Sequence, residues 1–368
     1  MPSEKKNSSA QSLQNPPQSQ QISPELYNSP FLKACRREHT AYTPVWIMRQ
    51  AGRYMKEFRD IRSKVSLLEL CKTPSLACEV TVHAQEYLEV DAAIIFADIL
   101  LPLDALGAGL DYVKGEGPVI ARPVRSEADF KNLLDIDAAE ALSYVMEAIK
   151  QTRQSLKPNI PLIGFASAPF TLASYLIEGG SSRNYENTKT MMYLRPDLWH
   201  ALMNKLVDLS IDYLNAQAKA GAQALQVFDS WVGSLSPQDY KTYVLPHSKR
   251  LIQNLEKGYP VIHFGTGSST LLPSMKEAGG DVIGLDWRVE LAEAWDSLGE
   301  VAVQGNLDPC VVFAEKDYIR EKSESILASV AGRAGHIFNL GHGVLPSMDP
   351  EKVKFLVDVV HSFKTEKN

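Results

Sequence analysis

The sequence predicts an α/β fold in which a single (β/α)8 TIM barrel follows a disordered N-terminal tail. Three observations favour this fold: eight short apolar runs, helix-like segments between them, and polar residues where the runs end. Continuously apolar strands joined by helices are typical of a parallel sheet covered on its faces, and a TIM barrel has eight such units. An open, doubly wound sheet is the alternative, but the first strand-to-helix turn lacks the GxGxxG motif.

The eight runs have the length and the side chains of buried strands. They are PVWIM (44–48), AAIIFAD (92–98), PLIGFAS (161–167), ALQVFDS (224–230), PVIHFG (260–265), VIGLDW (282–287), VAVQGNLD (301–308) and HIFNLGHG (336–343). Helices are predicted over Leu67–Leu88, Glu127–Leu156, Pro196–Ala220, Pro237–Leu255, Leu271–Ala278, Glu290–Leu298, Ala314–Ala331 and Pro350–Phe363. Strand and helix therefore alternate along most of the chain.

Residues 1–22 differ from the rest because they are polar and rich in Ser, Gln and Pro. Such a segment buries too little apolar surface to offset the entropy of ordering, so we predict a disordered tail there and one barrel domain over residues 23–368. The tail has neither an apolar core nor an arginine-rich stretch, so it supports neither a secretory signal nor an arginine-rich transit peptide, and a plastid peptide is the less favoured alternative. The four cysteines form no CxxC pair, which favours a reducing compartment and predicts a cytoplasmic protein.

The net charge of -6 argues against nucleic acid or a membrane surface as a partner. No apolar run approaches the 18 or so residues that span a bilayer. Any site for anions must therefore be a local cleft.

Polar or glycine residues stand at the C-terminal end of nearly every predicted strand. The carboxyl ends of barrel strands share one mouth, where catalytic groups are contributed by several strands. Taken singly, each position is explained better by the ordinary polarity of strand ends, and only the joint pattern favours a shared mouth. The residues concerned are Arg49, Asp98, Ser167, Asp229, Ser230, Gly265, Asp286, Asn306, Asp308, Asn339 and His342.

Three arginines, Arg49, Arg53 and Arg62, fall within 14 residues after the first predicted strand. A guanidinium is always charged and offers a planar fork of donors that matches carboxylate or phosphate, so the cluster predicts a site for a polyanion. Structural ion pairs are the alternative interpretation. Asp98 ends the most uniformly apolar run, where an unpaired carboxylate is costly. Its partner is either one of the arginines Arg49 and Arg53, or N–H donors of a ligand.

Motifs for cofactors are absent from the sequence. There is no Walker motif, and the eight histidines form no HExxH or His-x-Cys pattern, so we expect neither an organic cofactor nor a metal. The reaction must then use protein charges and the substrate itself.

Seven stretches together resemble the uroporphyrinogen decarboxylase family. They are PVWIMRQAGRYMKEFRDIR (44–62), AAIIFADIL (92–100), GFASAPFTLASYLIEGG (164–180), ALQVFDSWVG (224–233), GLDW (284–287), QGNLDP (304–309) and NLGHG (339–343). The resemblance runs from about Pro30 to the last predicted helix. Ser167 departs from the glycine common in the family, and Trp231 from the histidine found in related enzymes.

The resemblance implies decarboxylation of the four acetate side chains of uroporphyrinogen III to methyl groups, giving coproporphyrinogen III for haem biosynthesis, without metal or cofactor. Asp98 and Arg49 would be catalytic. Asp98 would bind the four pyrrole N–H groups and stabilise the cation that forms when a pyrrole carbon is protonated. The substrate would be bound by Arg49, Gln50, Ala51, Gly52, Arg53, Arg62, Asp98, Tyr175, Ser230 and His342.

Several points stay open at the level of sequence. The proton donor is Arg49, His342, Tyr175 or a bound water. Tyr175 is alternatively a packing residue, and Phe165 and Phe228 either line the face of the macrocycle or belong to the ordinary core. A homodimer is expected by resemblance alone. A corrinoid-linked methyltransferase of the same superfamily and a non-catalytic tetrapyrrole carrier are the alternative functions.

Overall fold

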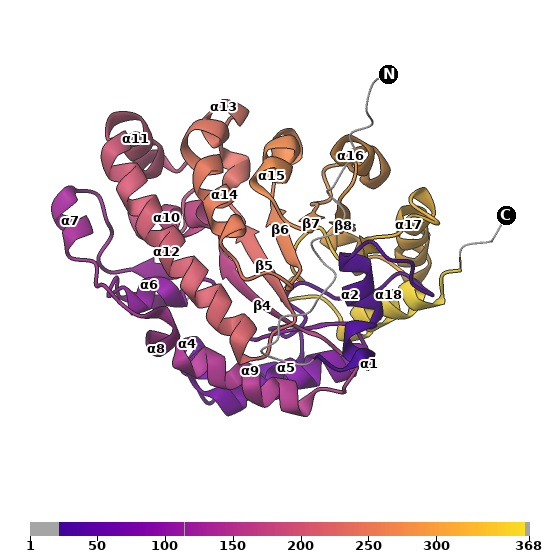
Figure 1. The fold of residues 1–368 in the computed structure, drawn as a ribbon. Helices are drawn as coiled ribbons and strands as arrows, with labels where there is room; N and C mark the ends of the chain where they lie inside the picture. Colours follow the sequence, from indigo (N-terminus) through magenta and orange to yellow (C-terminus); the bar gives the residue numbers. More distant parts are fainter. Residues whose placement is uncertain (1–21, 114, 365–368) are drawn as a thin grey trace, which may run out of the picture.

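The computed structural model describes residues 22–113 and 115–364. A curled sheet of seven parallel strands forms its centre, and helices lie around the outside (Figure 1). The strands, in spatial order, are β1 (Ala93–Ile94), β4 (Leu162–Ser167), β5 (Ala224–Asp229), β6 (Val261–Gly265), β7 (Val282–Gly284), β8 (Ala302–Gln304) and β9 (His336–Ile337). This order follows the chain without reversal, so the barrel prediction is confirmed and the doubly wound alternative is wrong.

Seven of the eight predicted strand segments contain a strand, and the segment 44–48 is the exception. It forms a single parallel bridge, Val45 to Phe338, next to β9. On its other side the carbonyl of Val45 accepts a hydrogen bond of 2.8 Å from the backbone N–H of Asp91, just before β1. The segment therefore occupies the eighth position of the barrel with isolated hydrogen bonds rather than a ladder.

Asp91 connects the segments that meet at this closure. Its carboxylate accepts hydrogen bonds from the Tyr42 hydroxyl at 2.6 Å and from the Val45 N–H at 2.8 Å. His361 Nε2, near the end of the last helix, lies 2.9 Å from the same carboxylate. One buried side chain thus joins the first segment of the barrel to the last helix.

Most predicted helices are present, but three of them are divided. The residues predicted as one helix over Leu67–Leu88 form two, because Pro74 has no N–H to continue the first and starts the second. Glu127–Leu156 divides into three helices, the first of which has a Ser126–Asp129 capping box. Pro237–Leu255 contains a π-helical turn before Leu245.

The helices of the first half are α1 (Pro24–Tyr27), α2 (Pro30–Cys35), α3 (Lys56–Arg62), α4 (Leu67–Lys72), α5 (Pro74–Leu88), α6 (Leu101–Ala105), α7 (Glu127–Lys131), α8 (Ala138–Ala141), α9 (Ser143–Ser155) and α10 (Pro169–Glu178). Those of the second half are α11 (Glu186–Leu194), α12 (Pro196–Ala220), α13 (Pro237–Asp239), η2 (Tyr240–Val244), α14 (Leu245–Gln253), α15 (Leu272–Ala278), α16 (Leu291–Leu298), α17 (Lys316–Ser329) and α18 (Pro350–Ser362). Short 3-10 turns are η1 (Val232–Ser234), η3 (Ser269–Leu271) and η4 (Pro309–Phe313).

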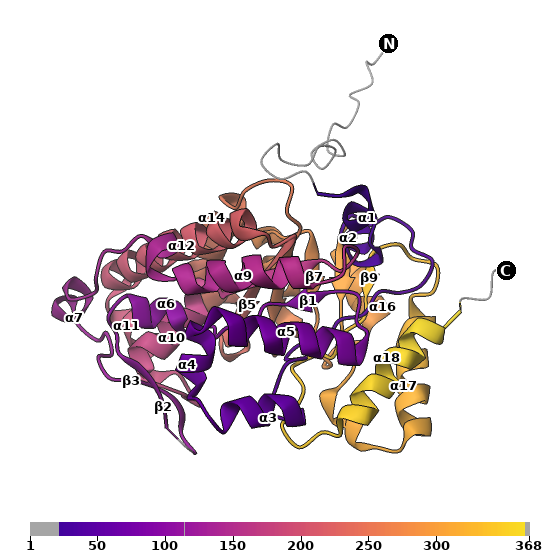
Figure 2. The same cartoon turned by 90° about the horizontal axis from the view of Figure 1, so that it is seen from below.

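A two-stranded antiparallel hairpin, β2 (Leu110–Val113) with β3 (Gly117–Ile120), is an element that the sequence analysis missed. It extends from the body of the protein on the side of α3 and α4 (Figure 2). Its base is attached to the end of α10, because Ile120 N–H donates to the carbonyl of Gly179 at 2.9 Å and Val119 forms a bridge with Gly180. The hairpin is therefore held against the helix that carries Tyr175.

The barrel interior and the layer under the helices belong to one hydrophobic cluster. All six residues of β4 and all six of β5 are buried, as expected for central strands covered on both faces. The predicted tail lies outside the described residues except for Ile22. The division into a tail over 1–22 and a domain over 23–368 therefore stays a prediction.

Candidate active site at the mouth of the barrel

A cavity of about 980 Å³ opens at the carboxyl ends of the strands. All ten residues predicted to bind substrate line it: Arg49, Gln50, Ala51, Gly52, Arg53, Arg62, Asp98, Tyr175, Ser230 and His342. They come from the loop after residue 48, from α3, from α10, and from the ends of β1, β5 and β9. Segments far apart in sequence are thus brought to one site, as the barrel prediction requires.

Only part of the predicted ring of polar strand ends faces this cavity. Arg49, Asp98, Ser230 and His342 line it, whereas the remaining seven strand-end residues do not. One of them holds the framework instead: Asn339 Oδ1 accepts a 3.0 Å hydrogen bond from the Met48 N–H. The expectation that all the strand-end polar groups share the mouth is therefore wrong for Ser167, Asp229, Gly265, Asp286, Asn306, Asp308 and Asn339.

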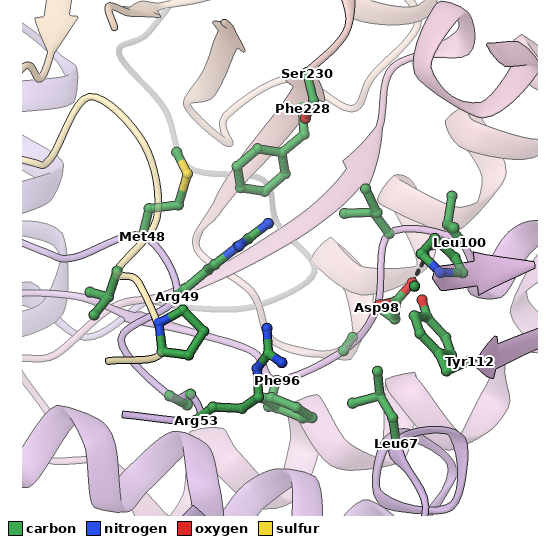
Figure 3. Close-up of a pocket in the computed structure, with 18 of the residues that line it drawn as sticks. Met48, Arg49, Arg53, Leu67, Phe96, Asp98, Leu100, Tyr112, Phe228 and Ser230 are labelled. Carbon is green, nitrogen blue, oxygen red and sulfur yellow. Dashed lines mark hydrogen bonds between the residues drawn. The ribbon is translucent and has the colours of Figure 1, made fainter. Parts of the chain in front are cut away.

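Asp98 lies on the cavity wall just beyond β1 (Figure 3). Its Oδ1 accepts a 2.8 Å hydrogen bond from the Leu100 N–H, and the Tyr112 hydroxyl also hydrogen-bonds to the carboxylate. Burial raises the pKa of Asp98, while the bonds from Tyr112 and Leu100 and the positive charge of Arg49 act in the opposite direction. Among the described residues no ion pair joins Asp98 to Arg49 or Arg53, so neither arginine is the direct partner that the sequence allowed.

Arg49 extends along the cavity toward Phe228 and Ser230 (Figure 3). Its backbone adopts the left-handed conformation, with φ of 63°, which is uncommon for a residue with a Cβ and costs free energy. The turn is fixed by the 2.9 Å bond from the Gln50 N–H to the carbonyl of Ile47. Burial lowers the pKa of Arg49, and the neighbouring charge of Arg53 lowers it further. Strain and desolvation are thus concentrated at one cationic side chain.

Gly343 provides the space for Arg49, a relation that the sequence analysis missed. A Cβ built on Gly343 would overlap the Cδ and Cγ atoms of Arg49. The residue belongs to the same NLGHG stretch as His342, so the last strand both contributes a cavity residue and leaves room for the arginine. Sequence offered one signal, two glycines flanking His342, without showing which side chain needs them.

The other two arginines differ in their surroundings. Arg53 is exposed and also points into the cavity, whereas Arg62 is half-buried and donates a hydrogen bond to the carbonyl of Val65. Gln50 is fully buried, and its side chain binds the loop itself, accepting from the Ile47 N–H and donating to the carbonyl of Ala92. Its amide therefore supports the arginine loop.

The wall opposite the arginine loop is aromatic. Phe165 and Phe228 form an edge-to-face pair with ring centroids 5.5 Å apart, and Phe264 continues the row at 6.1 Å from Phe228. All three line the cavity while also belonging to the hydrophobic cluster, so the two interpretations of Phe165 and Phe228 hold together. Phe264 was not predicted. Its β6 run had been noted only for its terminal glycine.

Tyr175 and His342 complete the polar lining. Tyr175 packs edge-on against Trp231, whose ring centroid is 5.8 Å away, and burial raises the pKa of Tyr175 to about 12. Burial, together with the charges of Arg49 and Arg288, lowers the pKa of His342 to about 4. Both side chains are therefore neutral near pH 7.

Tyr112 lines the cavity beside Asp98, and the sequence analysis did not predict it as a site residue. The run LDYVKGEGPVI carried a usable signal, since two β-rich stretches separated by glycines predict a hairpin. Nothing in its spacing indicates that Tyr112 reaches Asp98.

Within residues 22–113 and 115–364, no group of three His, Cys, Asp or Glu side chains is arranged to hold a metal ion. In the same part of the chain no helix has the length and apolar character needed to cross a bilayer.

A parallel barrel whose mouth gathers arginines and aromatic rings around one carboxylate defines a class: barrel proteins with a large pocket lined by cationic and aromatic side chains. The chain belongs to the uroporphyrinogen decarboxylase (URO-D) family, whose model matches residues 26–363. The uroporphyrinogen decarboxylase of Carboxydothermus hydrogenoformans is 55% identical over 340 residues, which cover 92% of this chain and 97% of that protein. The uroporphyrinogen decarboxylase of Sorangium cellulosum is 52% identical over 334 residues, 90% of this chain and 95% of that one.

Among solved structures, a methyltransferase from Methanosarcina mazei is similar, with a TM-score of 0.77 over 90% of this chain and 98% of that chain. At 18% sequence identity this likeness concerns the fold alone.

Proposed function

We propose that this chain catalyses the decarboxylation of uroporphyrinogen III to coproporphyrinogen III, converting four acetate side chains to methyl groups without metal or organic cofactor. Family membership supports the activity, since the matching relatives carry the name uroporphyrinogen decarboxylase. The observation that carries the chemistry is one carboxylate, Asp98, on the wall of a cavity that also contains three arginines. A substrate with eight carboxylates and four pyrrole N–H groups is complementary to both features.

Substrate binding is assigned to two sets of groups. Asp98 accepts hydrogen bonds from the pyrrole N–H groups, which can converge because the methylene bridges of the macrocycle are flexible. Arg49, Arg53 and Arg62 bind peripheral carboxylates, and each such charge-assisted hydrogen bond contributes about 1.5–3 kcal/mol. Backbone groups of Gln50, Ala51 and Gly52, and the side chains of Tyr175, Ser230 and His342, complete the polar contacts. Phe165, Phe228 and Phe264 cover the apolar face.

Loss of CO₂ leaves an electron pair that needs an acceptor. Protonation of the pyrrole carbon next to the acetate-bearing one generates an iminium-like cation within the substrate, and the electrons of the breaking C–C bond neutralise it by forming an exocyclic C=CH2 double bond. A proton then adds to this methylene carbon and the ring carbon releases the proton it had gained, which leaves a methyl group on an intact pyrrole. The Asp98 carboxylate is already fixed where this positive charge develops, so it stabilises the transition state more than the neutral ground state. The catalytic pair is Asp98 and Arg49.

Four groups are candidates for the proton donor: Arg49, Tyr175, His342 and a bound water. His342, with a pKa of about 4, carries little imidazolium near pH 7, and Tyr175, with a pKa of about 12, releases its proton reluctantly. Burial brings the pKa of Arg49 down from its ordinary value. These shifts disfavour His342 and Tyr175 and leave Arg49 and a bound water as the candidate donors to the reacting carbon.

The protein is proposed to act as a cytoplasmic homodimer. Cys35, Cys71, Cys78 and Cys310 are all free thiols, which suits a reducing compartment. Sedimentation of the purified protein tests the dimer, and a monomer at micromolar concentration would contradict it.

Anaerobic incubation with uroporphyrinogen III tests the proposed reaction. We expect release of four CO₂ per macrocycle and the successive appearance of hepta-, hexa-, penta- and tetracarboxylate products on chromatography. Tight binding of uroporphyrinogen without CO₂ release would instead identify a tetrapyrrole carrier. Stoichiometric zinc together with methyl transfer from a corrinoid would identify the methyltransferase alternative.

A further inference from the structure

The hairpin β2–β3 brings a second element to the carboxylate at the centre of the cavity. Tyr112, Val113 and the segment 115–118 line the cavity together with Asp98. Tyr112 is paired with Pro118 across the hairpin, and its hydroxyl reaches the Asp98 carboxylate (Figure 3). Among the described residues, the Leu100 N–H also donates a hydrogen bond to Asp98.

The attachment of the hairpin restricts where Tyr112 can lie. The N–H of Ala121 donates to the carbonyl of Gly109 at 2.9 Å, and that of Ile120 to the carbonyl of Gly179 at the same distance. The carbonyl of Pro118 approaches Gly180 so closely that a Cβ there would lie 2.9 Å from it. The hairpin base is thus fixed to the end of α10, and the Tyr112 ring stands on a rigid support.

We infer that Tyr112 is a positioning residue for the decarboxylation: its hydroxyl orients the Asp98 carboxylate toward the cavity and holds it in the ionised form that the reaction requires. This inference rests on the proposed function of Asp98. A phenol donates its proton to a carboxylate more strongly when that carboxylate is charged, so the bond favours the anion. Burial acts in the opposite direction and raises the pKa of Asp98.

The other groups that face Asp98 are neutral, so Tyr112, Leu100 and Arg49 are the groups that oppose the effect of burial on the pKa of Asp98. Cys71 on α4, Tyr175 on α10 and Tyr213 on α12 lie within electrostatic range of the carboxylate. Burial raises the pKa of all three, and it raises that of Tyr112 as well. They remain neutral throughout the acid range. Arg49 remains cationic, so its contribution does not vary with pH there.

Tyr112→Phe tests the inference because it removes the hydroxyl and keeps the ring. Without that hydrogen bond Asp98 holds its proton more tightly, and the acid limb of kcat/KM moves to higher pH. We expect a shift of about one pH unit, equivalent to about 1.4 kcal/mol, so activity on that limb falls about tenfold and is restored by raising the pH. A loss of equal size at every pH would indicate mere damage to the fold and contradict the inference.

Tyr193→Phe is the matched control. The Tyr193 hydroxyl donates to Asp239 at 3.1 Å on the surface, away from the cavity, so the same chemical change there should leave the acid limb in place. The position of the limb does not depend on how much of either variant is folded. Coincident limbs for wild type and Tyr112→Phe would overturn the inference.

A direct titration separates this inference from the proposed reaction. Carbon-13 NMR of labelled aspartate follows the Asp98 carboxyl without substrate, with Asp98→Asn assigning the resonance. We expect the midpoint to move to higher pH in Tyr112→Phe and not in Tyr193→Phe. An unmoved midpoint defeats the role of Tyr112, whereas failure of the wild-type protein to release CO₂ defeats the proposed function alone.

Discussion

Asp98 follows β1 and Asp229 ends β5, yet the surroundings of the two carboxylates differ. Asp98 lines the cavity and accepts hydrogen bonds from Tyr112 and Leu100. Asp229 is fully buried, does not line the cavity, and has His263 Nε2 at 3.7 Å and the Thr171 hydroxyl at 3.5 Å as its nearest polar neighbours. Phe228 and Ser230 on either side of Asp229 face the cavity, so Asp229 must point the other way. The direction of the side chain, and not its position near the end of a strand, decides which carboxylate faces the cavity.

The largest effect should come from Asp98→Asn, which removes the charge and keeps the shape. Removing a preorganised electrostatic group of this kind costs about 10²–10³ in kcat. We expect a loss of this size in CO₂ release, with an unchanged circular dichroism spectrum. Near-normal turnover would place Asp98 in the same class as Asp229.

Arg49→Lys tests whether the guanidinium of Arg49 binds a substrate carboxylate with both arms of its fork. The substitution keeps the charge but loses the planar fork, and one charge-assisted hydrogen bond of about 1.5–3 kcal/mol corresponds to about a 10- to 100-fold fall in kcat/KM. Initial rates over a range of uroporphyrinogen concentrations measure it. Equal kinetics for the two proteins would count against bidentate binding by Arg49.

Gly343→Ala should have a smaller effect through Arg49. The added methyl group overlaps the arginine stem, and overpacking of this kind typically costs about 1–3 kcal/mol, so we expect about a tenfold loss of kcat/KM. The double variant with Arg49→Lys should lose less than the product of the two single losses. Fully multiplicative losses would show that Gly343 acts independently of Arg49.

Asp229→Asn should have the smallest effect on catalysis, within about twofold in kcat, because Asp229 touches no cavity surface. Its effect should appear in stability. Burial raises the pKa of Asp229, so in the wild type the ionised form is disfavoured by folding and this contribution to stability is lost as pH rises above the unfolded value of about 3.9. Asp229→Asn has no carboxyl group at this position, so its stability does not fall with pH for this reason.

Urea unfolding from pH 3 to pH 7 measures this difference for Asp229. The free energy of unfolding of Asp229→Asn, relative to wild type, should increase with pH. A large drop in kcat, with stability unchanged, would show that the two carboxylates are functionally alike.

The comparison also shows what sequence could and could not supply. The barrel was predictable because each strand run is continuously apolar and each is followed by an amphipathic helix. All ten predicted substrate-binding residues line one cavity. Eight of them lie at the end of a predicted strand or just after it, whereas Arg62 and Tyr175 lie on α3 and α10. Pro74 also indicates that the helix predicted over Leu67–Leu88 is divided, but the apolar pattern continues on both sides of it and favoured a single helix.

The remaining features depend on tertiary contacts. Segment 44–48 has the side chains of a strand, but its neighbours bind it through isolated hydrogen bonds. The pairing of Tyr112 with Asp98, and of Gly343 with Arg49, joins residues on different elements that no periodicity relates. The direction of Asp229 follows from the side of β5 that faces the cavity, and the run ALQVFDS does not reveal that side because it is buried on both faces.

The central claim is that the Asp98 anion stabilises the positive charge that the macrocycle acquires while CO₂ leaves. Single-turnover CO₂ release from a saturated complex of uroporphyrinogen with Asp98→Asn tests it most directly, because saturation removes any effect on binding. A rate constant reduced by about 10²–10³ is the predicted result. A rate constant equal to that of the wild type, with only KM increased, would show that Asp98 merely binds the substrate and would contradict the claim.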